Sequence, residues 1–530
     1  IRQGYFGIIA FVMSCIFIID LGLYGFWGFR LDATPIFYFF SSPKDAMASV
    51  SFWFILLGIL AMLIYAAILY GIFYAVLIRE KAPLKIPYQR QYVSLVLLLL
   101  TAALFIPIRG GFSVSTMNLS KVYYSQNQRM NHAAINPAFS FMYSATHQNN
   151  FDKQYRFMDP KVADDLLAEM LDKPVAATDS IPQILNTQRP NIIFIILESF
   201  STHLMETMGG QPNVAVNMDK FGKEGVLFTN FYANSFRTDR GLASIISGYP
   251  GQPSTSIMKY PEKTDGLPSI PRSLKNAGYS LEYYYGGDAD FTNMRSYLVS
   301  SGIEKIISET DFPLSERQGK WGAPDHTLFQ RFLKDLKEEK QQEPFFKIVQ
   351  TSSSHEPFEV PFYRLDDKVL NAFAYADSCV GDFVRQYKET PMWKNTLIVL
   401  VPDHLGAYPR PVENPLEGHT IPLILIGGAV KEPRVVDTYA SQIDIAATLL
   451  SQLGLPHDDF TFSKNIFNPS SPHFGYFTEP TLFGRVTAEN QLVYNLDANT
   501  VQIDEGTEKG ANLEKGKAFL QKLYDDLAKR

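Results

Sequence analysis

Three long apolar segments occupy most of the first 110 residues, and they constrain the fold of this chain more than any other feature. They span residues 5–28, 51–78 and 92–108 and contain very few charged side chains. A helix of about 20 residues crosses the hydrocarbon core of a bilayer, so the first two segments are long enough and the third is near the lower limit. Each could instead be a buried core helix, but three such segments together predict a transmembrane region at 1–110.

The charges of the connecting loops predict how these helices are oriented. The loop between the second and third segments contains a single acid, Glu80, and four bases: Arg79, Lys81, Lys85 and Arg90. Basic loops stay on the cytoplasmic side, which places everything after the third segment outside the cytoplasm. We therefore expect a multi-pass protein of the inner or plasma membrane whose remaining part is extracytoplasmic.

Two further features concern the first segment. Asp20 lies inside it and is either a functional intramembrane carboxylate or a polar contact within the helix bundle. The chain starts at Ile1 rather than at a methionine, so we expect that upstream sequence has been removed, with an even number of further helices. No signal peptide is visible, and insertion through the first helix would not require one.

The rest of the chain has the composition of an acidic globular protein. Residues 1–110 carry 8 Lys and Arg against 4 Asp and Glu, whereas the whole chain carries 48 against 54. This acidic balance argues against nucleic acid as the main partner. Cys15 and Cys379 are the only cysteines and are far apart in the sequence, which argues against a disulfide framework.

The sequence changes character after a polar stretch at 111–189, which we expect to be a juxtamembrane linker with one helix at 160–172. Short apolar runs typical of buried parallel strands then alternate with helical patterns. The strands are expected at 191–197, 281–285, 345–350, 397–401 and 421–426, and the helices at 241–247, 269–276, 325–338, 369–388 and 441–453. This order predicts an α/β domain with a mostly parallel sheet at 190–480, completed by residues 481–530 with a terminal helix.

Polar side chains follow two of these strands. Glu198 comes directly after the first expected strand, and Asp403 and His404 come after the fourth. Thr238 precedes a helix, whose free N–H groups and positive end favour an anion. Because ligands bind at the carboxyl ends of parallel strands, these four side chains could hold a divalent cation and make Thr238 a nucleophile. Each also has an ordinary alternative: a surface carboxylate, a helix cap or a chance Asp-His pair.

Longer motifs surround these residues. In chain order they are NIIFIILES at 191–199, SFRTDRGLASIISGYP at 235–250, YYGGDADFTNM at 284–294, WGAPDHTLF at 321–329, TSSSHEPF at 351–358, NAFAYADS at 371–378 and VPDHLG at 401–406. Together they resemble the alkaline phosphatase and sulfatase superfamily, and within it the lipoteichoic acid synthase-like phosphoglycerol transferases. The segment RLDATPIFYFFSSPKDA at 30–46 extends the resemblance into the membrane part.

The resemblance implies roles for individual residues. The metal ligands of the family match Glu198, Thr238, Asp403 and His404, and Thr238 is also the implied nucleophile. His355 matches a histidine that contacts the transferred phosphate or the leaving oxygen, although it could also be a packed structural histidine. His419 falls where related phosphoethanolamine transferases place a histidine for the substrate or a second metal.

One segment departs from the family pattern and leaves the transferred group open. Lipoteichoic acid synthases carry Trp and Arg there to hold glycerol phosphate, whereas this chain has Thr292 and Met294. Arg295 and Trp321 are candidate substitutes that would contact the substrate, and Arg295 is equally compatible with a solvated helix position. Asp288 either orients a polar head group or caps the following helix.

The resemblance implies a two-step transfer of phosphoglycerol from phosphatidylglycerol to a hydroxyl of a glycan or growing polymer. Mn²⁺ is the implied metal, with Mg²⁺ and Zn²⁺ as alternatives that accept the same ligands. Phosphoethanolamine transfer and phosphodiester hydrolysis are rival activities, whereas a true sulfatase would need Cys or Ser at the position of Thr238. A hypothesis of another class is a non-catalytic membrane protein that binds glycans or regulates an active relative.

Overall fold

The computed structural model of the chain divides into two compact units, Ile1–Asn149 and Asn150–Arg530. The boundary between them falls inside the stretch expected to be a linker, 111–189. The residues that the structure describes are 2–27, 29–32, 52–79, 89–112, 115–125, 127–146, 150–338, 341–406, 408 and 414–530.

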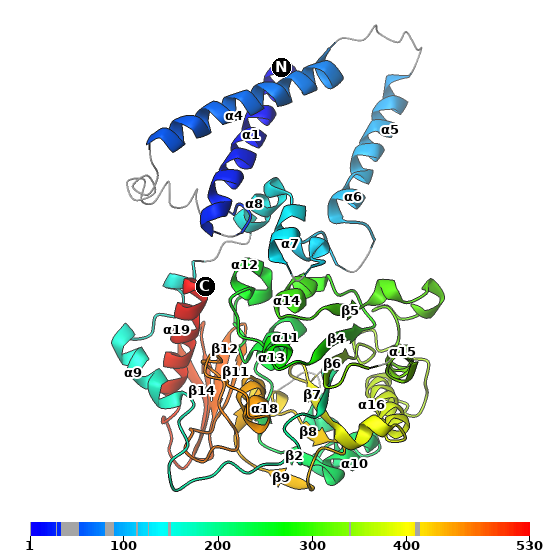
Figure 1. Ribbon diagram of the computed structural model, residues 1–530, viewed down its shortest axis with the longest axis vertical. Coiled ribbons are helices and arrows are strands. Elements are labelled where there is room, and N and C mark those ends of the chain that lie inside the picture. Colours follow the sequence, from blue (N-terminus) through cyan, green and yellow to red (C-terminus); the bar gives the residue numbers. More distant parts are fainter. Residues whose placement is uncertain are drawn as a thin grey trace. The chain divides into compact units, whose positions relative to one another are not determined.

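In the described part of the first unit, three helical spans are long and apolar enough to cross a membrane (Figure 1). They are Arg2–Gly25 in α1 (Arg2–Trp27), Phe52–Ile78 in α4 (Phe52–Phe73) with a π-helical turn, and Gln91–Arg109 in α5 (Arg90–Ala103) and α6 (Phe105–Arg109). Few of their apolar side chains are buried and many are exposed, which suits contact with lipid. The three segments expected from the sequence are therefore helices that fit a transmembrane region. Two short helices follow, α7 (Gln128–Ala134) and α8 (Pro137–Thr146).

Asp20 in α1 makes local polar contacts. Its Oδ2 lies 3.1 Å from Nη1 of Arg30, and its Oδ1 accepts a hydrogen bond from the backbone N–H of Leu31 at 2.7 Å. Asp20 therefore makes polar contacts with the segment that follows α1, in keeping with a structural polar contact rather than a functional carboxylate. The basic loop at 79–90 and the segment at 30–46 lie mostly outside the described residues, so the expected orientation of the helices stays a prediction.

The second unit is built on an eight-stranded sheet with the order β5-β4-β6-β1-β7-β8-β2-β9. Neighbouring strands are parallel except where β8 pairs with β7 and β2, so the sheet is mostly parallel, as predicted. The bounds are β1 Asn191–Leu197, β2 Val226–Phe228, β4 Ser280–Tyr285, β5 Lys305–Ile307, β6 Phe345–Gln350, β7 Thr396–Pro402, β8 Leu423–Ile426 and β9 Arg434–Val436.

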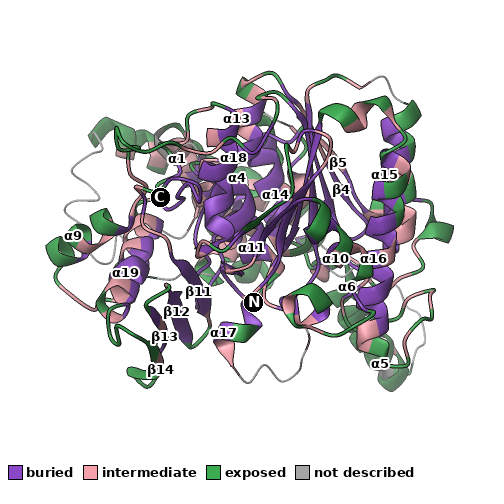
Figure 2. Cartoon of the chain, turned by 90° about the horizontal axis from the view of Figure 1, so that it is seen from below, coloured by how far each residue is buried: buried purple, intermediate pink, exposed green. Residues whose placement is uncertain are grey.

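The alternation of side chains along β1 creates two hydrophobic cores. Ile192, Phe194 and Ile196 face one core, and the residues between them face the other. The first face is covered by α11 (Thr238–Ser247), α13 (Ile270–Asn276), α14 (Met294–Ser300) and α18 (Ile445–Gln452). The second is covered by α10 (Val216–Glu224), α15 (Asp325–Glu338) and α16 (Lys368–Tyr387). Figure 2 shows the resulting layers, with a buried sheet and outer helices that are buried on one side only.

A smaller antiparallel sheet completes the second unit. Its strands are β11 (Gly475–Glu479), β12 (Leu482–Val486), β13 (Asn490–Asn495) and β14 (Thr500–Gly506). The terminal helix α19 (Leu513–Lys529) packs against β12 and lies beside α9 (Pro160–Met170) (Figure 1). A two-stranded sheet joins β3 (Phe231–Tyr232) to β10 (Ala440–Ser441).

Candidate active site

The pairing of two central strands brings the first three candidate side chains together. β1 and β7 are parallel neighbours, and their last residues, Leu197 and Pro402, are paired in register. Glu198 follows the first of these strands and Asp403 follows the second, so both carboxylates emerge at one edge of the sheet. A backbone hydrogen bond of 3.1 Å from the Asp403 N–H to the Leu197 carbonyl holds the two strand ends next to each other.

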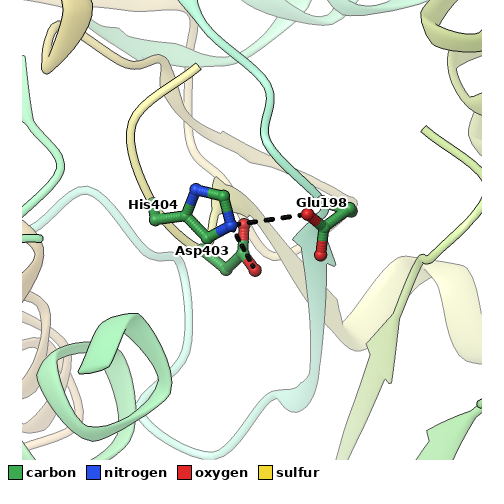
Figure 3. Close-up of side chains that lie close together, drawn as sticks. All are labelled: Glu198, Asp403 and His404. Carbon is green, nitrogen blue, oxygen red and sulfur yellow. Dashed lines mark ion pairs between the residues drawn. The ribbon is translucent and has the colours of Figure 1, made fainter. Parts of the chain in front are cut away.

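The imidazole of His404 lies against both carboxylates (Figure 3). Its Nε2 is 3.4 Å from Oε1 of Glu198 and 3.6 Å from Oδ2 of Asp403. One ligand atom from each of these three residues lies within 4.8 Å of the others. Glu198 and Asp403 are buried, and only the His404 side chain, 13% exposed, reaches solvent.

Ser199 ties the cluster together from an unusual backbone conformation. Its φ of +57° places it in the left-handed region, which few residues other than glycine adopt. In this conformation its N–H donates to Oδ1 of Asp403 at 3.0 Å and its hydroxyl donates to Oε1 of Glu198 at 2.7 Å. Strained backbone of this kind is concentrated at functional sites, where the surrounding structure holds it. Ser199 therefore orients both carboxylates.

The pKa values of the three groups depend on one another. Burial and the charge of Glu198 raise the pKa of Asp403 to about 7, while the nearby Thr238 side chain opposes this shift. Burial alone would raise the pKa of Glu198, but the hydrogen bond and charge of His404 lower it to about 2. Burial would lower the pKa of His404, but the two carboxylates raise it to about 9. Two buried carboxylates this close repel each other, so the pair is stable only with a positive charge beside it.

The donor set fits a divalent cation. Oδ2 of Asp403 is fully buried and has no hydrogen-bond partner among the described residues, although it faces the shared space between the three groups. A buried carboxylate oxygen is normally hydrogen-bonded, paired or bound to a metal. Two carboxylates, one imidazole and a hydroxyl are ligands that Mn²⁺, Mg²⁺ or Zn²⁺ accept. Glu198, Asp403 and His404 would hold the ion, with Thr238 as a fourth ligand.

Thr238 reaches this cluster because α11 packs directly on the strand end. Thr238 is the first residue of the helix, and it is partly exposed whereas the rest of α11 is buried. Its side chain is close enough to Asp403 to influence the pKa of that group. A Cβ added to Gly241, one turn further on, would lie 1.6 Å from the Asp403 carbonyl oxygen. Only glycine permits this approach of the helix to the backbone of the site.

Replacement of Gly241 by alanine is expected to disturb the site and the fold together. Alanine normally stabilises a helix relative to glycine, but here the new methyl group would force α11 away from Asp403. We expect a loss of about 1–3 kcal/mol in the free energy of unfolding, as for other overpacked cores, and weaker Mn²⁺ binding. Thermal unfolding and titration with Mn²⁺ measure both effects.

Gly222→Ala in α10 is the matched control, because a Cβ there meets only the movable side chain of Leu227 at 3.3 Å. Equal stability and Mn²⁺ affinity of the Gly241→Ala variant and the unaltered protein would contradict the close packing of α11.

A pocket with about 400 Å³ of empty space lies next to the cluster. Glu198, Thr238, His355 and Trp321 are among the residues that line it. The remaining lining residues are Asp239, Leu242, Tyr285, Phe291, Thr292, Met294, Gln350 and Ser352. The pocket gives a substrate access to the Thr238 hydroxyl.

His355 belongs to a group of aromatic side chains that line the pocket. The rings of His355 and Trp321 are 4.0 Å apart between centroids, and the Trp321 ring meets Phe291 edge to face at 6.0 Å. The indole N–H of Trp321 donates to the Glu356 carbonyl at 2.7 Å, which fixes the ring. The charge of His355 also helps to lower the pKa of Glu198, so His355 lies near the cluster. His355 and Trp321, both candidates from the sequence, thus line the same pocket as Thr238.

The other three candidates lie outside the set of pocket-lining residues. Arg295 pairs with Asp290, with Nε 2.7 Å from Oδ1, and reaches Ser308 with Nη2. Asp288 accepts the N–H of Asp290 at 2.9 Å, a local turn contact. His419 is fully buried, stacked on Phe477 at 4.0 Å and hydrogen-bonded to the Ala233 carbonyl and to Glu479. The described contacts of all three are with neighbouring protein groups, and their roles toward a substrate stay predictions.

Several residues of the site were missed by the sequence reasoning. Ser199 lies inside the motif at 191–199, and Gly241 inside the motif at 235–250, but neither was given a role. Gln350 ends an expected strand with a polar side chain, the same signal that identified Glu198. Tyr285 ends another strand in this way. The rule that ligands bind at strand ends would have found these last two.

Comparison with known proteins adds an independent finding. A sequence model of the sulfatase family matches residues 190–455, which is half of the chain. The chain belongs to the sulfatase family. This confirms the superfamily expected from the motifs. Members of this superfamily are typically metalloenzymes, in keeping with the cluster of Glu198, Asp403 and His404.

Its relatives among characterised proteins are enzymes. Lipoteichoic acid synthase 2 of Bacillus subtilis is 23% identical over 304 residues, which cover 52% of this chain and 46% of that protein. Phosphoglycerol transferase I of Xanthomonas campestris is 24% identical over 320 residues, covering 55% of this chain and 45% of that protein. The chain therefore spans about half the length of these curated relatives.

Solved structures confirm the fold. A protein of the alkaline phosphatase superfamily from Vibrio parahaemolyticus has a TM-score of 0.62 and 26% identity, covering 71% of this chain and 98% of that one. A lipoteichoic acid synthase from Listeria monocytogenes has a TM-score of 0.55 and 19% identity, covering 70% and 98%. The α/β domain with a mostly parallel sheet is thus of the alkaline phosphatase and sulfatase type.

Proposed function

We propose that this protein is a membrane-anchored, metal-dependent phosphoglycerol transferase. It takes phosphoglycerol from phosphatidylglycerol and passes it to a hydroxyl of a glycan or growing polymer. The observation that carries this proposal is the Thr238 hydroxyl, which lies at the start of α11 beside a buried Glu198–Asp403–His404 cluster and opens into a pocket. Relatives named lipoteichoic acid synthase and phosphoglycerol transferase support the choice of the transferred group.

In the first step, the Thr238 hydroxyl gives up its proton to water, and the resulting Oγ alkoxide attacks the phosphorus of the lipid phosphodiester. A Thr–O–P bond forms, the bond from phosphorus to the diacylglycerol oxygen breaks, and diacylglycerol leaves with a proton. His355 lines the same pocket as Thr238 and donates that proton to the leaving oxygen. The N–H groups at the start of α11 stabilise charge on the phosphoryl oxygens.

In the second step, the acceptor hydroxyl attacks the phosphorus of the phosphoglyceryl-threonine. His355, now neutral, takes the proton of the acceptor, and the Thr238 oxygen leaves. The free enzyme is restored, and one phosphodiester has been exchanged for another. Water in place of the acceptor would make the same protein a phosphodiesterase, so exclusion of water during the second step favours transfer.

A divalent cation held by Glu198, Thr238, Asp403 and His404 would lower the pKa of the threonine hydroxyl and offset negative charge on the phosphate. Mn²⁺ is the proposed ion. Ser199 orients two of these ligands through the hydrogen bonds described above, which keeps the donor atoms in place before an ion arrives.

The apolar helices of the first unit suit a lipid donor. Phosphatidylglycerol stays in the bilayer, so an enzyme that uses it gains from spanning the same membrane. We propose a multi-pass protein of the inner or plasma membrane with the catalytic domain outside the cytoplasm, where glycan acceptors occur. We further propose that residues 111–189 link the membrane region to the catalytic domain. That domain spans 190–480 and is completed by residues 481–530.

Mass spectrometry of the Thr238 peptide tests the function. The full chain is incubated with phosphatidylglycerol vesicles and Mn²⁺ but without acceptor, then quenched in acid and digested. We expect one added phosphoglycerol group on Thr238, which is absent when EDTA is included. Vesicles of phosphatidylethanolamine serve as the comparison. Phosphoethanolamine on Thr238 instead would move the protein to the related transferases, and no adduct with no lipid turnover would favour a non-catalytic role.

A further inference from the structure

Gln350 is a pocket residue to which neither the family motifs nor the cation site assign a role. It is the last residue of β6 and is paired in register with Ile196 of β1 and Tyr285 of β4. Paired residues of neighbouring strands share a face, so the Gln350 side chain lies on the face covered by α11. It is fully buried and lines the pocket next to Thr238.

The amide of Gln350 is held at one end and free at the other. The hydroxyl of Tyr283 donates a hydrogen bond to its Oε1. Nε2 is buried and has no hydrogen-bond partner within the described part of the chain. An unpaired buried donor costs free energy, and such groups in native proteins usually have a ligand or water as partner. The Tyr283 contact therefore leaves the two N–H donors of this pocket-lining residue without a described partner.

The neighbouring side chains suit a neutral, hydroxylated group. Among the described residues, no Arg or Lys lines the pocket. Asp239 is a lining residue, but its carboxylate is already paired with Arg240 at 3.3 Å. The apolar surface comes from aromatic rings and from Leu242 and Met294, and the other polar groups away from the cation cluster are hydroxyls, His355 and the Gln350 amide.

We propose that Nε2 of Gln350 donates a hydrogen bond to a hydroxyl oxygen of the head group and so selects a hydroxylated head group over an ammonium one. This inference rests on the proposed function and names the head-group chemistry that its site accepts. A glycerol hydroxyl can accept the N–H of an amide. An ammonium group has only donors, so it would face the Gln350 N–H groups without a hydrogen bond and with electrostatic repulsion.

Two substitutions test this selection in the full chain with mixed vesicles of phosphatidylglycerol and phosphatidylethanolamine. Gln350→Met keeps the volume and removes the donors, and we expect kcat/KM for phosphatidylglycerol to fall about tenfold while that for phosphatidylethanolamine changes less than about twofold. Gln350→Glu places a carboxylate oxygen at the same point and is expected to raise the ratio of phosphatidylethanolamine to phosphatidylglycerol turnover further.

Gln521→Met is the matched control. Gln521 is also a fully buried glutamine, but its amide accepts from the N–H groups of Phe157 and Met158 and donates to the Met158 carbonyl. We expect this control to lower the Tm and leave the lipid ratio unchanged. Gln350→Met loses the acceptor of the Tyr283 hydroxyl, so it is also expected to lower the Tm, but unlike the control it should change the lipid ratio.

The outcomes separate this inference from the proposed function. An equal fall in turnover of both lipids would mean that Gln350 contacts the phosphate they share, and it would overturn head-group selection. An unchanged ratio in both variants would also overturn it, while the transferase function would stand. Absence of turnover in the unaltered protein with either lipid would overturn the proposed function and this inference with it.

Discussion

Thr238→Ala is expected to lower turnover of phosphatidylglycerol by at least about 10³-fold, because loss of a covalent nucleophile removes the whole two-step route. Thr238 is partly exposed at the first position of α11, so the fold should tolerate the change. The hydroxyl is also a proposed metal ligand. Activity is therefore measured as the rate of diacylglycerol release at saturating Mn²⁺, and bound metal is quantified in the same samples.

Thr238→Ser is the matched variant for this experiment. It keeps the oxygen and removes only the methyl group, so a measurable fraction of the activity should remain and the serine should carry the adduct. If Thr238→Ala released diacylglycerol at the rate of the unaltered protein, the hydroxyl would not be the nucleophile.

Asp403→Asn is expected to weaken Mn²⁺ binding by at least about 100-fold, because it removes a charged ligand. Mutation of residues that only support metal ligands typically lowers metal affinity by about 10–100-fold, and loss of a ligand should cost more. The effect on the metal-free protein should have the opposite sign. Burial and the neighbouring charge of Glu198 raise the pKa of Asp403, so a neutral amide relieves a repulsion in the empty site. We therefore expect an unchanged or higher Tm without metal and the loss of the Tm increase that Mn²⁺ produces.

Asp382→Asn is the control for this charge change. Asp382 is 62% exposed and pairs with Arg385 on the surface of α16, a contact of the kind that contributes little to stability. The Mn²⁺ affinity and turnover of the Asp382→Asn variant should match those of the unaltered protein. Calorimetric titration measures the affinities, and an Asp403→Asn variant that bound Mn²⁺ as tightly as the control would remove this residue from the ligand set.

The main sheet could be predicted because its strands carry a strong local signal. The expected strands at 191–197 and 345–350 coincide with β1 and β6, since a continuous run of β-branched and aromatic residues is unambiguous. The small sheet of β11 to β14 was not predicted as strands. Its sequences mix polar and apolar residues, and its buried face depends on packing against α19, which lies further along the chain.

The candidate site was partly predictable for the same reason. Glu198 and Asp403 follow strong strands, and parallel pairing alone brings them together. The place of His419 could not be inferred, because its burial against Phe477 depends on a strand of the small sheet. The close approach of Gly241 to the site depends on how α11 is packed, which no local pattern reveals.

In the proposed mechanism, four side chains from three distant parts of the chain share one cation that activates Thr238. Anomalous diffraction at the manganese edge, from crystals of the full chain grown with Mn²⁺ at the concentration that supports activity, would locate this cation. We expect one strong peak within bonding distance of Glu198, Thr238, Asp403 and His404. A fully active preparation with its manganese elsewhere, or with no peak among these residues, would contradict it.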